Sequence, residues 1–166
     1  MKKEDIVQIY IDTSLLNEWF ARLMRGEKPE KDPEIIRFLG AYKDIEKFIS
    51  IFTIAELVES LLFHEKRIRD HMKKMEIIES FAKLLMETTG LKIIELEKKD
   101  EHKGVFISPQ VVKYTSICGS VKDAIHVCIA QYEDLWLITH DNKFGRLKPL
   151  YEKILTDRNL LKLFKE

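Results

Sequence analysis

Short apolar segments alternate along this chain with longer stretches in which apolar residues recur at helical spacing. Four of these segments are expected to be β-strands, at residues 7–11, 48–52, 91–96 and 135–138. Nearly continuous apolar strands are typical of a parallel sheet that is covered by helices on both faces. The helical stretches between them provide the crossover connections that parallel strands need. The alternation therefore predicts an α/β fold, namely a three-layer α/β/α sandwich with a mostly parallel central sheet.

The chain contains no linker, repeat or low-complexity stretch, so residues 1–166 are expected to form a single domain. The longest predicted helix, at 65–88, gives this domain a long helical segment around residues 64–90, which Gly90 ends. Residues 153–156 are expected to form an edge strand. The same spacing predicts further helices at 14–24, 32–42, 54–62, 121–132, 142–151 and 157–164, with residues 100–114 helical or irregular and broken near Pro109.

Composition excludes several classes of protein. Hydrophobic residues make up 45% of the chain, which is enough to build a core and is not typical of disorder. The 28 Lys and Arg residues balance 28 Asp and Glu residues, so the net charge provides no general attraction to nucleic acid. No run of about 18 apolar residues occurs, so no membrane span is expected. Cys118 and Cys128 lack the spacing of metal ligands, which favours a reduced, cytoplasmic location.

Acidic residues follow three of the predicted strands. Asp12 comes directly after the first strand, Glu56 lies one helical turn beyond the second, and Asp141 follows the last. A fourth acid, Asp123, lies near the start of the apolar helical stretch before that last strand. Because the carboxyl ends of parallel strands meet at one edge of a sheet, where ligands bind, the four side chains are expected to gather there.

Each acid also has a purely structural explanation. Asp12 and Asp141 could each cap the helix that follows, although Ser14 could replace Asp12 in that role. Glu56 completes the pattern of a capping box in Thr53-Ile54-Ala55-Glu56.

Asp123 completes the same pattern in Ser120-Val121-Lys122-Asp123. However, Val127 and Ala130 share its helical face, and a carboxylate in apolar surroundings is costly unless it is paired or bound to metal.

The four acids taken together favour a metal site. Two carboxylates about 4 Å apart repel each other by roughly 4 kcal/mol at an effective dielectric constant of about 20. A cation such as Mg²⁺ or Mn²⁺, which prefers carboxylate and water ligands, would offset this repulsion. Such an ion also lowers the pKa of a bound water and neutralises charge on a phosphate. The sequence shows neither a Ser-His-Asp order nor a histidine cluster, so phosphodiester hydrolysis is the predicted reaction. Its expected metal ligands and catalytic residues are Asp12, Glu56, Asp123 and Asp141.

Four segments resemble the motifs of the PIN-domain nucleases, including the VapC-type toxins. These segments are IYIDTS at 9–14, TIAEL at 53–57, VKDA at 121–124 and ITHDNKF at 138–144. The resemblance implies a PIN-like fold and Mg²⁺- or Mn²⁺-dependent cleavage of RNA. It implies that the same four acids form the metal site and that Ser14 and Thr139 support it. It also implies three partners: an RNA substrate, a small antitoxin protein and a second copy of the chain.

Several neighbouring residues are further candidates. Lys143, Arg146 and Lys148 follow Asp141 and are expected to contact RNA. His126 lies one helical turn after Asp123 and could orient it, although a buried structural histidine is the more common case. Two alternative functions stay open. One is a non-catalytic PIN-like module that binds RNA or protein, and the other is a DNA nuclease or phosphatase that uses the same carboxylates.

Overall fold

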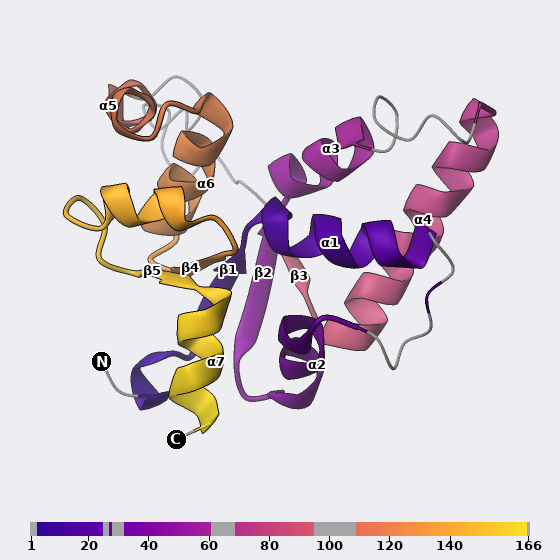
Figure 1. Cartoon of the computed structure of the whole chain (residues 1–166), viewed down its shortest axis with the longest axis horizontal. Helices are drawn as coiled ribbons and strands as arrows, with labels where there is room; N and C mark the ends of the chain where they lie inside the picture. Colours follow the sequence, from indigo (N-terminus) through magenta and orange to yellow (C-terminus); the bar gives the residue numbers. More distant parts are fainter. Residues whose placement is uncertain (1–2, 25–26, 28–31, 61–68, 95–108, 166) are drawn as a thin grey trace.

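A computed structural model describes residues 3–24, 27, 32–60, 69–94 and 109–165. These residues contain a five-stranded, all-parallel sheet with the strand order β3-β2-β1-β4-β5. Its strands are β1 (Gln8–Ile11), β2 (Glu46–Ser50), β3 (Lys92–Ile94), β4 (Trp136–Thr139) and β5 (Ile154–Thr156). β1 is therefore the central strand, and the predicted edge strand β5 pairs with β4 (Figure 1). The predicted α/β class is confirmed, and the sheet is parallel throughout.

Two hydrophobic cores lie on opposite faces of this sheet and make the three layers. The first core packs the sheet against α1 (Thr13–Met24), α2 (Glu34–Ala41), α3 (Ile51–Glu59), α4 (His71–Thr89) and α7 (Asp157–Lys165). The second packs it against α5 (Pro109–Cys118), α6 (Val121–Tyr132) and the 3₁₀ helix η5 (Asn142–Leu147). A short 3₁₀ helix, η1 (Lys3–Asp5), precedes β1. Both termini lie at the lower end of the molecule in Figure 1.

The central strand β1 supplies residues to both cores. Ile9 and Ile11 belong to the first core and Tyr10 to the second, and all three are fully buried. This division follows from the strand geometry, in which successive side chains point to opposite faces. Asp12 continues the alternation on the side of Tyr10, and its backbone N–H still donates to the carbonyl of Ile138 at 3.0 Å. The strand therefore delivers Asp12 to the face that α6 covers.

The boundary between the second strand and the following helix differs from the prediction. β2 ends at Ser50 instead of continuing through residues 51 and 52, because Ser50 is the N-cap of α3. The Ser50 hydroxyl accepts from the backbone N–H of Thr53 at 3.2 Å, and the Thr53 side chain accepts from the N–H of Ser50 at 3.4 Å. This reciprocal pair is the real capping box, so the capping box predicted for Thr53 and Glu56 is wrong. Glu56 is thereby free to point elsewhere.

The long predicted helix also begins later than expected. α4 starts at His71 because Asp70 caps it by accepting from the N–H groups of Met72 and Lys73. A continuous helix from residue 65 is thus wrong, and residues 61–68 lie outside the described part. Gly90 ends α4 as predicted, in the left-handed conformation with φ 71°.

Smaller differences concern the remaining elements. The predicted third strand is seen as β3, with residues 95 and 96 outside the described part, and α5 begins at Pro109. The predicted helix at 142–151 is the shorter η5, which ends at Leu147. None of the helices in the described ranges is both long and apolar enough to cross a membrane.

Candidate active site

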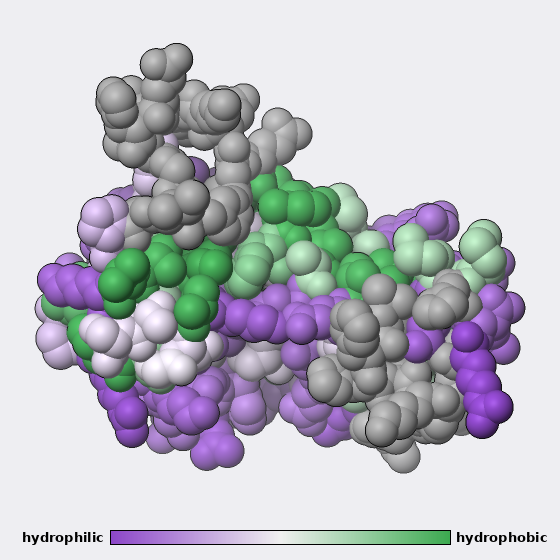
Figure 2. Space-filling view, turned by 90° about the horizontal axis from the view of Figure 1, so that it is seen from above, coloured by the Kyte–Doolittle hydropathy of each residue, from purple (hydrophilic) through white to green (hydrophobic). Residues whose placement is uncertain are grey.

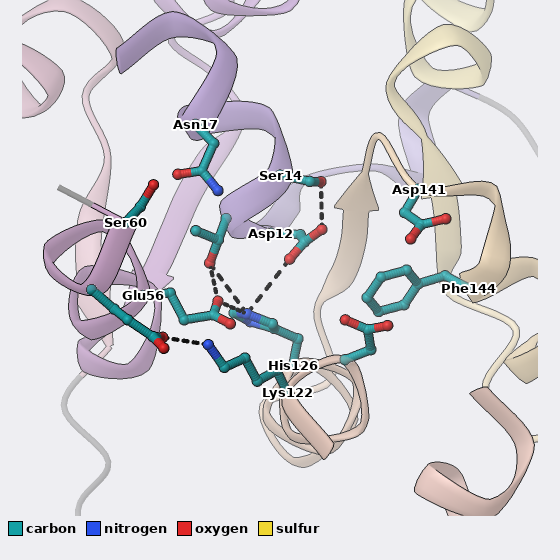
Figure 3. A pocket seen from close by; sticks show the side chains of 12 residues that line it. Asp12, Ser14, Asn17, Glu56, Ser60, Lys122, His126, Asp141 and Phe144 are labelled. Carbon is teal, nitrogen blue, oxygen red and sulfur yellow. Dashed lines mark hydrogen bonds and ion pairs between the residues drawn. The ribbon is translucent and has the colours of Figure 1, made fainter. Parts of the chain in front are cut away.

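All four predicted acids line one pocket at the carboxyl edge of the sheet. The pocket has a volume of about 320 Å³, and its walls come from α1, α3, α6 and the segment after β4 (Figure 3). Its lining residues are Asp12, Thr13, Ser14, Asn17, Glu56, Glu59, Ser60, Lys122, Asp123, His126, Asp141 and Phe144. Figure 2 views the molecule from this end, where hydrophilic residues form a band beside hydrophobic patches on the surface. Segments that are up to 129 positions apart in the sequence, from Asp12 to Asp141, thus meet in one place.

Hydrogen bonds hold Asp12 in one orientation. Its side chain is buried, with 5% of the residue exposed, and its Oδ2 accepts from two hydroxyl groups. Ser14 Oγ donates to this oxygen at 2.6 Å and Thr139 Oγ1 donates at 2.8 Å. The two residues predicted to support the site therefore both contact Asp12. The second carboxylate oxygen of Asp12, Oδ1, lies 3.5 Å from Nε2 of His126.

Glu56 lies on α3 and points across the pocket toward α6. Its Oε2 accepts a hydrogen bond from Thr13 Oγ1, and it lies 2.7 Å from Nε2 of His126. Burial alone would raise the pKa of Glu56, but the hydrogen bonds from His126 and Thr13 outweigh it and the pKa is lowered. Glu56 is therefore ionised at neutral pH and firmly held.

His126 links two of the four acids. It is almost completely buried, and its Nε2 lies between Glu56 and Asp12 (Figure 3). The sequence suggested that it could orient Asp123, whereas its hydrogen bonds run to Glu56, Thr13 and Tyr10. Its position one turn after Asp123 indicated that it lies near the acids. Its partner Glu56 could not be inferred from the sequence, because Glu56 belongs to a helix 70 positions away.

Asp123 is the acid in the least favourable electrostatic setting. Burial raises its pKa, and the negative charges of Asp12 and Asp141 raise it further, while the Ser120 hydroxyl and His126 act in the opposite direction. The backbone N–H of Asp123 donates to Ser120 Oγ at 3.2 Å, so Ser120 is the N-cap of α6, as predicted. The raised pKa indicates that negative charge at this place in the pocket lacks a sufficient partner.

Asp141 combines a structural and a pocket position. Its Oδ1 accepts from the N–H of Lys143 at 2.8 Å and so caps η5, as the structural explanation predicted. Its carboxylate also lines the pocket, opposite α3 in Figure 3. The capping explanation and the pocket location are thus both true of this residue.

The basic residues predicted to contact RNA lie outside the pocket lining. Lys143, Arg146 and Lys148 are exposed along η5, and Lys143 Nζ lies 4.0 Å from Asp141. Within the described residues, the Lys or Arg side chain that lines the pocket is Lys122, which pairs with Glu59 across its rim. Lys122 was not predicted from the sequence, where it stands only within the capping pattern of residues 120–123.

The oxygen-rich lining suits a hard divalent cation in its chemistry. In the described ranges, no three His, Cys, Asp or Glu side chains already lie close enough together to hold a metal ion. The carboxylates thus share a pocket without forming a finished coordination sphere. Asn17 adds a further oxygen, since its buried Oδ1 has no hydrogen-bond partner among the residues that the structure describes. An unpartnered buried acceptor among carboxylates fits a site that receives a cation or a hydrogen-bond donor.

The fold and the pocket define an α/β protein with an acidic site at the carboxyl edge of a parallel sheet. Residues 9–149 match the PIN domain family, and the chain belongs to that family. The PIN family is a family of nucleases, hydrolases that generally use divalent metal ions. The resemblance noted in the sequence motifs is therefore confirmed. No curated protein sequence matches the chain significantly.

Solved structures with a similar fold cover nearly the whole chain. VapBC-1 from nontypeable Haemophilus influenzae is 18% identical, with a TM-score of 0.56 over 91% of this chain and 98% of that chain. PAE2754 from Pyrobaculum aerophilum is 16% identical, with a TM-score of 0.55 over 97% and 98%. FitAcB from Neisseria gonorrhoeae is 15% identical, with a TM-score of 0.54 over 89% and 95%. At these identities, the matches establish a shared fold.

Proposed function

We propose that this chain is a Mg²⁺- or Mn²⁺-dependent endoribonuclease that hydrolyses RNA phosphodiester bonds. The observation that carries the proposal is the electrostatics of the pocket. Four carboxylates reach it from separate segments, and the charges of Asp12 and Asp141 raise the pKa of Asp123 beyond the effect of burial. Such crowding is costly to the fold unless a cation enters, and a bound divalent cation would supply an activated water for phosphodiester hydrolysis.

Asp12, Glu56, Asp123 and Asp141 would hold the ion, directly or through water. The bound ion would supply a water of lowered pKa and offset the charge of the phosphate. Ser14 and Thr139 orient Asp12 through their hydrogen bonds to its Oδ2. One of the four carboxylates accepts the proton of the attacking water.

Lys122 is the residue best placed to bind a phosphate at the pocket. It is half exposed and pairs with Glu59, which also lies at the rim. Such an exposed pair contributes little stability, so a phosphate can take the place of Glu59 at low cost. The exposed Lys143, Arg146 and Lys148 would extend this contact along the RNA backbone.

We also propose that the chain is the toxin of a toxin–antitoxin pair, acts in the cytoplasm and forms a homodimer. The support is the resemblance of its motifs to VapC-type toxins and the fold that it shares with VapBC-1 and FitAcB. Copurification with the product of a small adjacent reading frame, followed by loss of cleavage in the complex, would test the antitoxin. Sedimentation of the purified chain would test the dimer.

The nuclease proposal is tested by incubating the purified chain with end-labelled single-stranded RNA, the same sequence as DNA, and a small phosphodiester. Each substrate is tested with Mg²⁺, with Mn²⁺ and with chelator. We expect metal-dependent cleavage of RNA that Asp12→Asn and Asp123→Asn abolish while the circular dichroism spectrum stays unchanged. Unchanged turnover in both variants would reject the site.

The same experiment separates the alternative functions. Cleavage of DNA or of the small phosphodiester in preference to RNA would indicate a DNA nuclease or phosphatase. RNA binding without cleavage, together with no measurable binding of Mg²⁺ or Mn²⁺, would indicate a non-catalytic binding module.

A further inference from the structure

A buried chain of hydrogen bonds runs from the centre of the sheet to the pocket. Tyr10 Oη lies 2.8 Å from Ser50 Oγ, 3.2 Å from Thr53 Oγ1 and 2.8 Å from His126 Nδ1. Tyr10 is fully buried and lies on the face of β1 that also delivers Asp12. A strand, a helix cap and a helix of the opposite layer therefore meet at one phenol group.

The Tyr10 hydroxyl is fully used by these three neighbours. A phenol has one proton to donate and two lone pairs to accept with. Ser50 and Thr53 are the capping pair of α3, and Glu56 lies one turn beyond Thr53 on the same helix. Tyr10 thus contacts the helix that carries Glu56 as well as the ring that binds it.

The other nitrogen of His126 faces acceptors. Nε2 lies 2.7 Å from Glu56 Oε2, 3.3 Å from Thr13 Oγ1 and 3.5 Å from Asp12 Oδ1. Carboxylates accept hydrogen bonds, and the Thr13 hydroxyl already donates its one proton to Glu56. In the neutral ring, these partners place the proton on Nε2. Nδ1 is then the nitrogen that accepts from Tyr10, which fixes both the tautomer and the rotation of the ring.

We propose that Tyr10 is a positioning residue of the candidate active site, which sets the ring of His126 so that His126 holds the Glu56 carboxylate beside Asp12. The inference rests on the proposed function, because it assigns the purpose of this network to the metal-binding carboxylates. Tyr10 acts through His126, without itself touching the substrate. Outer groups that orient ligands in this way typically change metal affinity or activity by about 10- to 100-fold when they are removed.

The test compares Tyr10→Phe with Tyr151→Phe. Both changes remove one buried phenol oxygen, but Tyr151 donates to backbone carbonyls of Ala130 and Leu135 away from the pocket lining. Three properties are measured: the melting temperature, the ¹⁵N resonances of the His126 ring, and the affinity for MnCl₂ by titration calorimetry. We expect both variants to melt lower than the wild type. We expect only Tyr10→Phe to shift the Nδ1 resonance and to weaken Mn²⁺ binding about tenfold or more.

A second pair of variants tests whether Tyr10 acts through His126. In a His126→Phe background, Tyr10→Phe should cause no further loss of Mn²⁺ affinity or of RNA cleavage, since the connecting ring is absent. Losses that multiply would overturn the proposal, as would a Tyr10→Phe protein with unchanged ring resonances and unchanged Mn²⁺ affinity.

Failure of the nuclease function is distinguishable from failure of this inference. A wild-type chain that binds Mn²⁺ but cleaves no RNA would reject the proposed function, while the ring resonances and the Mn²⁺ affinities still decide the role of Tyr10. If the wild type bound no Mn²⁺, a metal-positioning role would be rejected along with the metal site.

Discussion

Removing the charge of Asp123 should make the metal-free protein more stable, although it should destroy the proposed activity. Asp123→Asn keeps the size of the side chain and removes the charge that Asp12 and Asp141 oppose. Two charges 4 Å apart interact by about 4 kcal/mol at an effective dielectric constant of about 20, and solvent screening at a partly buried group reduces this several-fold. We therefore expect a gain of about 1 kcal/mol, which corresponds to a rise of about 2–4 °C in melting temperature for a chain of this size.

The assay is thermal unfolding in EDTA and again in excess Mg²⁺. In EDTA, Asp123→Asn should melt above the wild type. In Mg²⁺ the order should reverse, because a ligand at about 100 times its dissociation constant stabilises the wild type by about 2.7 kcal/mol and the variant has lost a ligand. Glu79→Gln, which changes an exposed carboxylate of α4, is the control and should keep the wild-type behaviour. A variant that melts below the wild type in EDTA would refute the electrostatic reasoning.

The pH dependence of this difference has a defined sign. The folded state raises the pKa of Asp123 above its ordinary value of 3.8, so the folded state binds the proton more readily than the unfolded chain. The repulsion that destabilises the fold is thus present at neutral pH and disappears as the pH falls through the raised pKa. The advantage of Asp123→Asn in EDTA should shrink over the same range. A constant advantage down to pH 3.8 would contradict this account.

Three further predictions concern other parts of the site. Glu56→Gln should destabilise the protein above pH 4.5, and the loss of stability should shrink as the pH falls below that value. The reason is that a carboxyl group with a lowered pKa stabilises the fold only while it is ionised. Denaturant titrations at several pH values measure this difference. Ser50→Ala should cost about 1 kcal/mol or more of unfolding free energy through loss of the α3 cap, and an unchanged denaturation midpoint would count against that cap. Lys122→Met should weaken binding of single-stranded RNA and lower the slope of log K against log salt by about 0.7, whereas Lys83→Met, on the exposed side of α4, should change neither.

The sequence was informative where local pattern determines structure. Asp12 and Asp141 were placed correctly because a parallel strand points its carboxyl end to one edge of the sheet, whatever the rest of the chain does. Gly90 ended α4 as expected, since a left-handed residue there favours glycine. These inferences needed only the strand and helix signals around each residue.

The sequence was ambiguous where two local patterns overlap. Thr53 with Glu56 matches the usual capping-box pattern, whereas Ser50 with Thr53 lacks the Glu or Gln of that pattern and yet forms the observed cap. The choice between them depends on where β2 stops pairing with β1 and on Tyr10 binding Ser50 and Thr53 from the sheet. Such contacts join residues about 40 positions apart, so no window of sequence contains them. The partner of His126 on α3 was hidden for the same reason.

The alternation along β1 has a consequence for the effects of insertions and deletions. Ile9 and Ile11 fill one core, while Tyr10 and Asp12 face the other layer. Core packing and site chemistry therefore depend on the same alternation of side chains along the strand. Adding or deleting one residue in this strand would exchange the two sets and bury a carboxylate among aliphatic side chains. Such a change would abolish folding and function together, whereas β5, at the sheet edge and outside the pocket lining, allows more freedom.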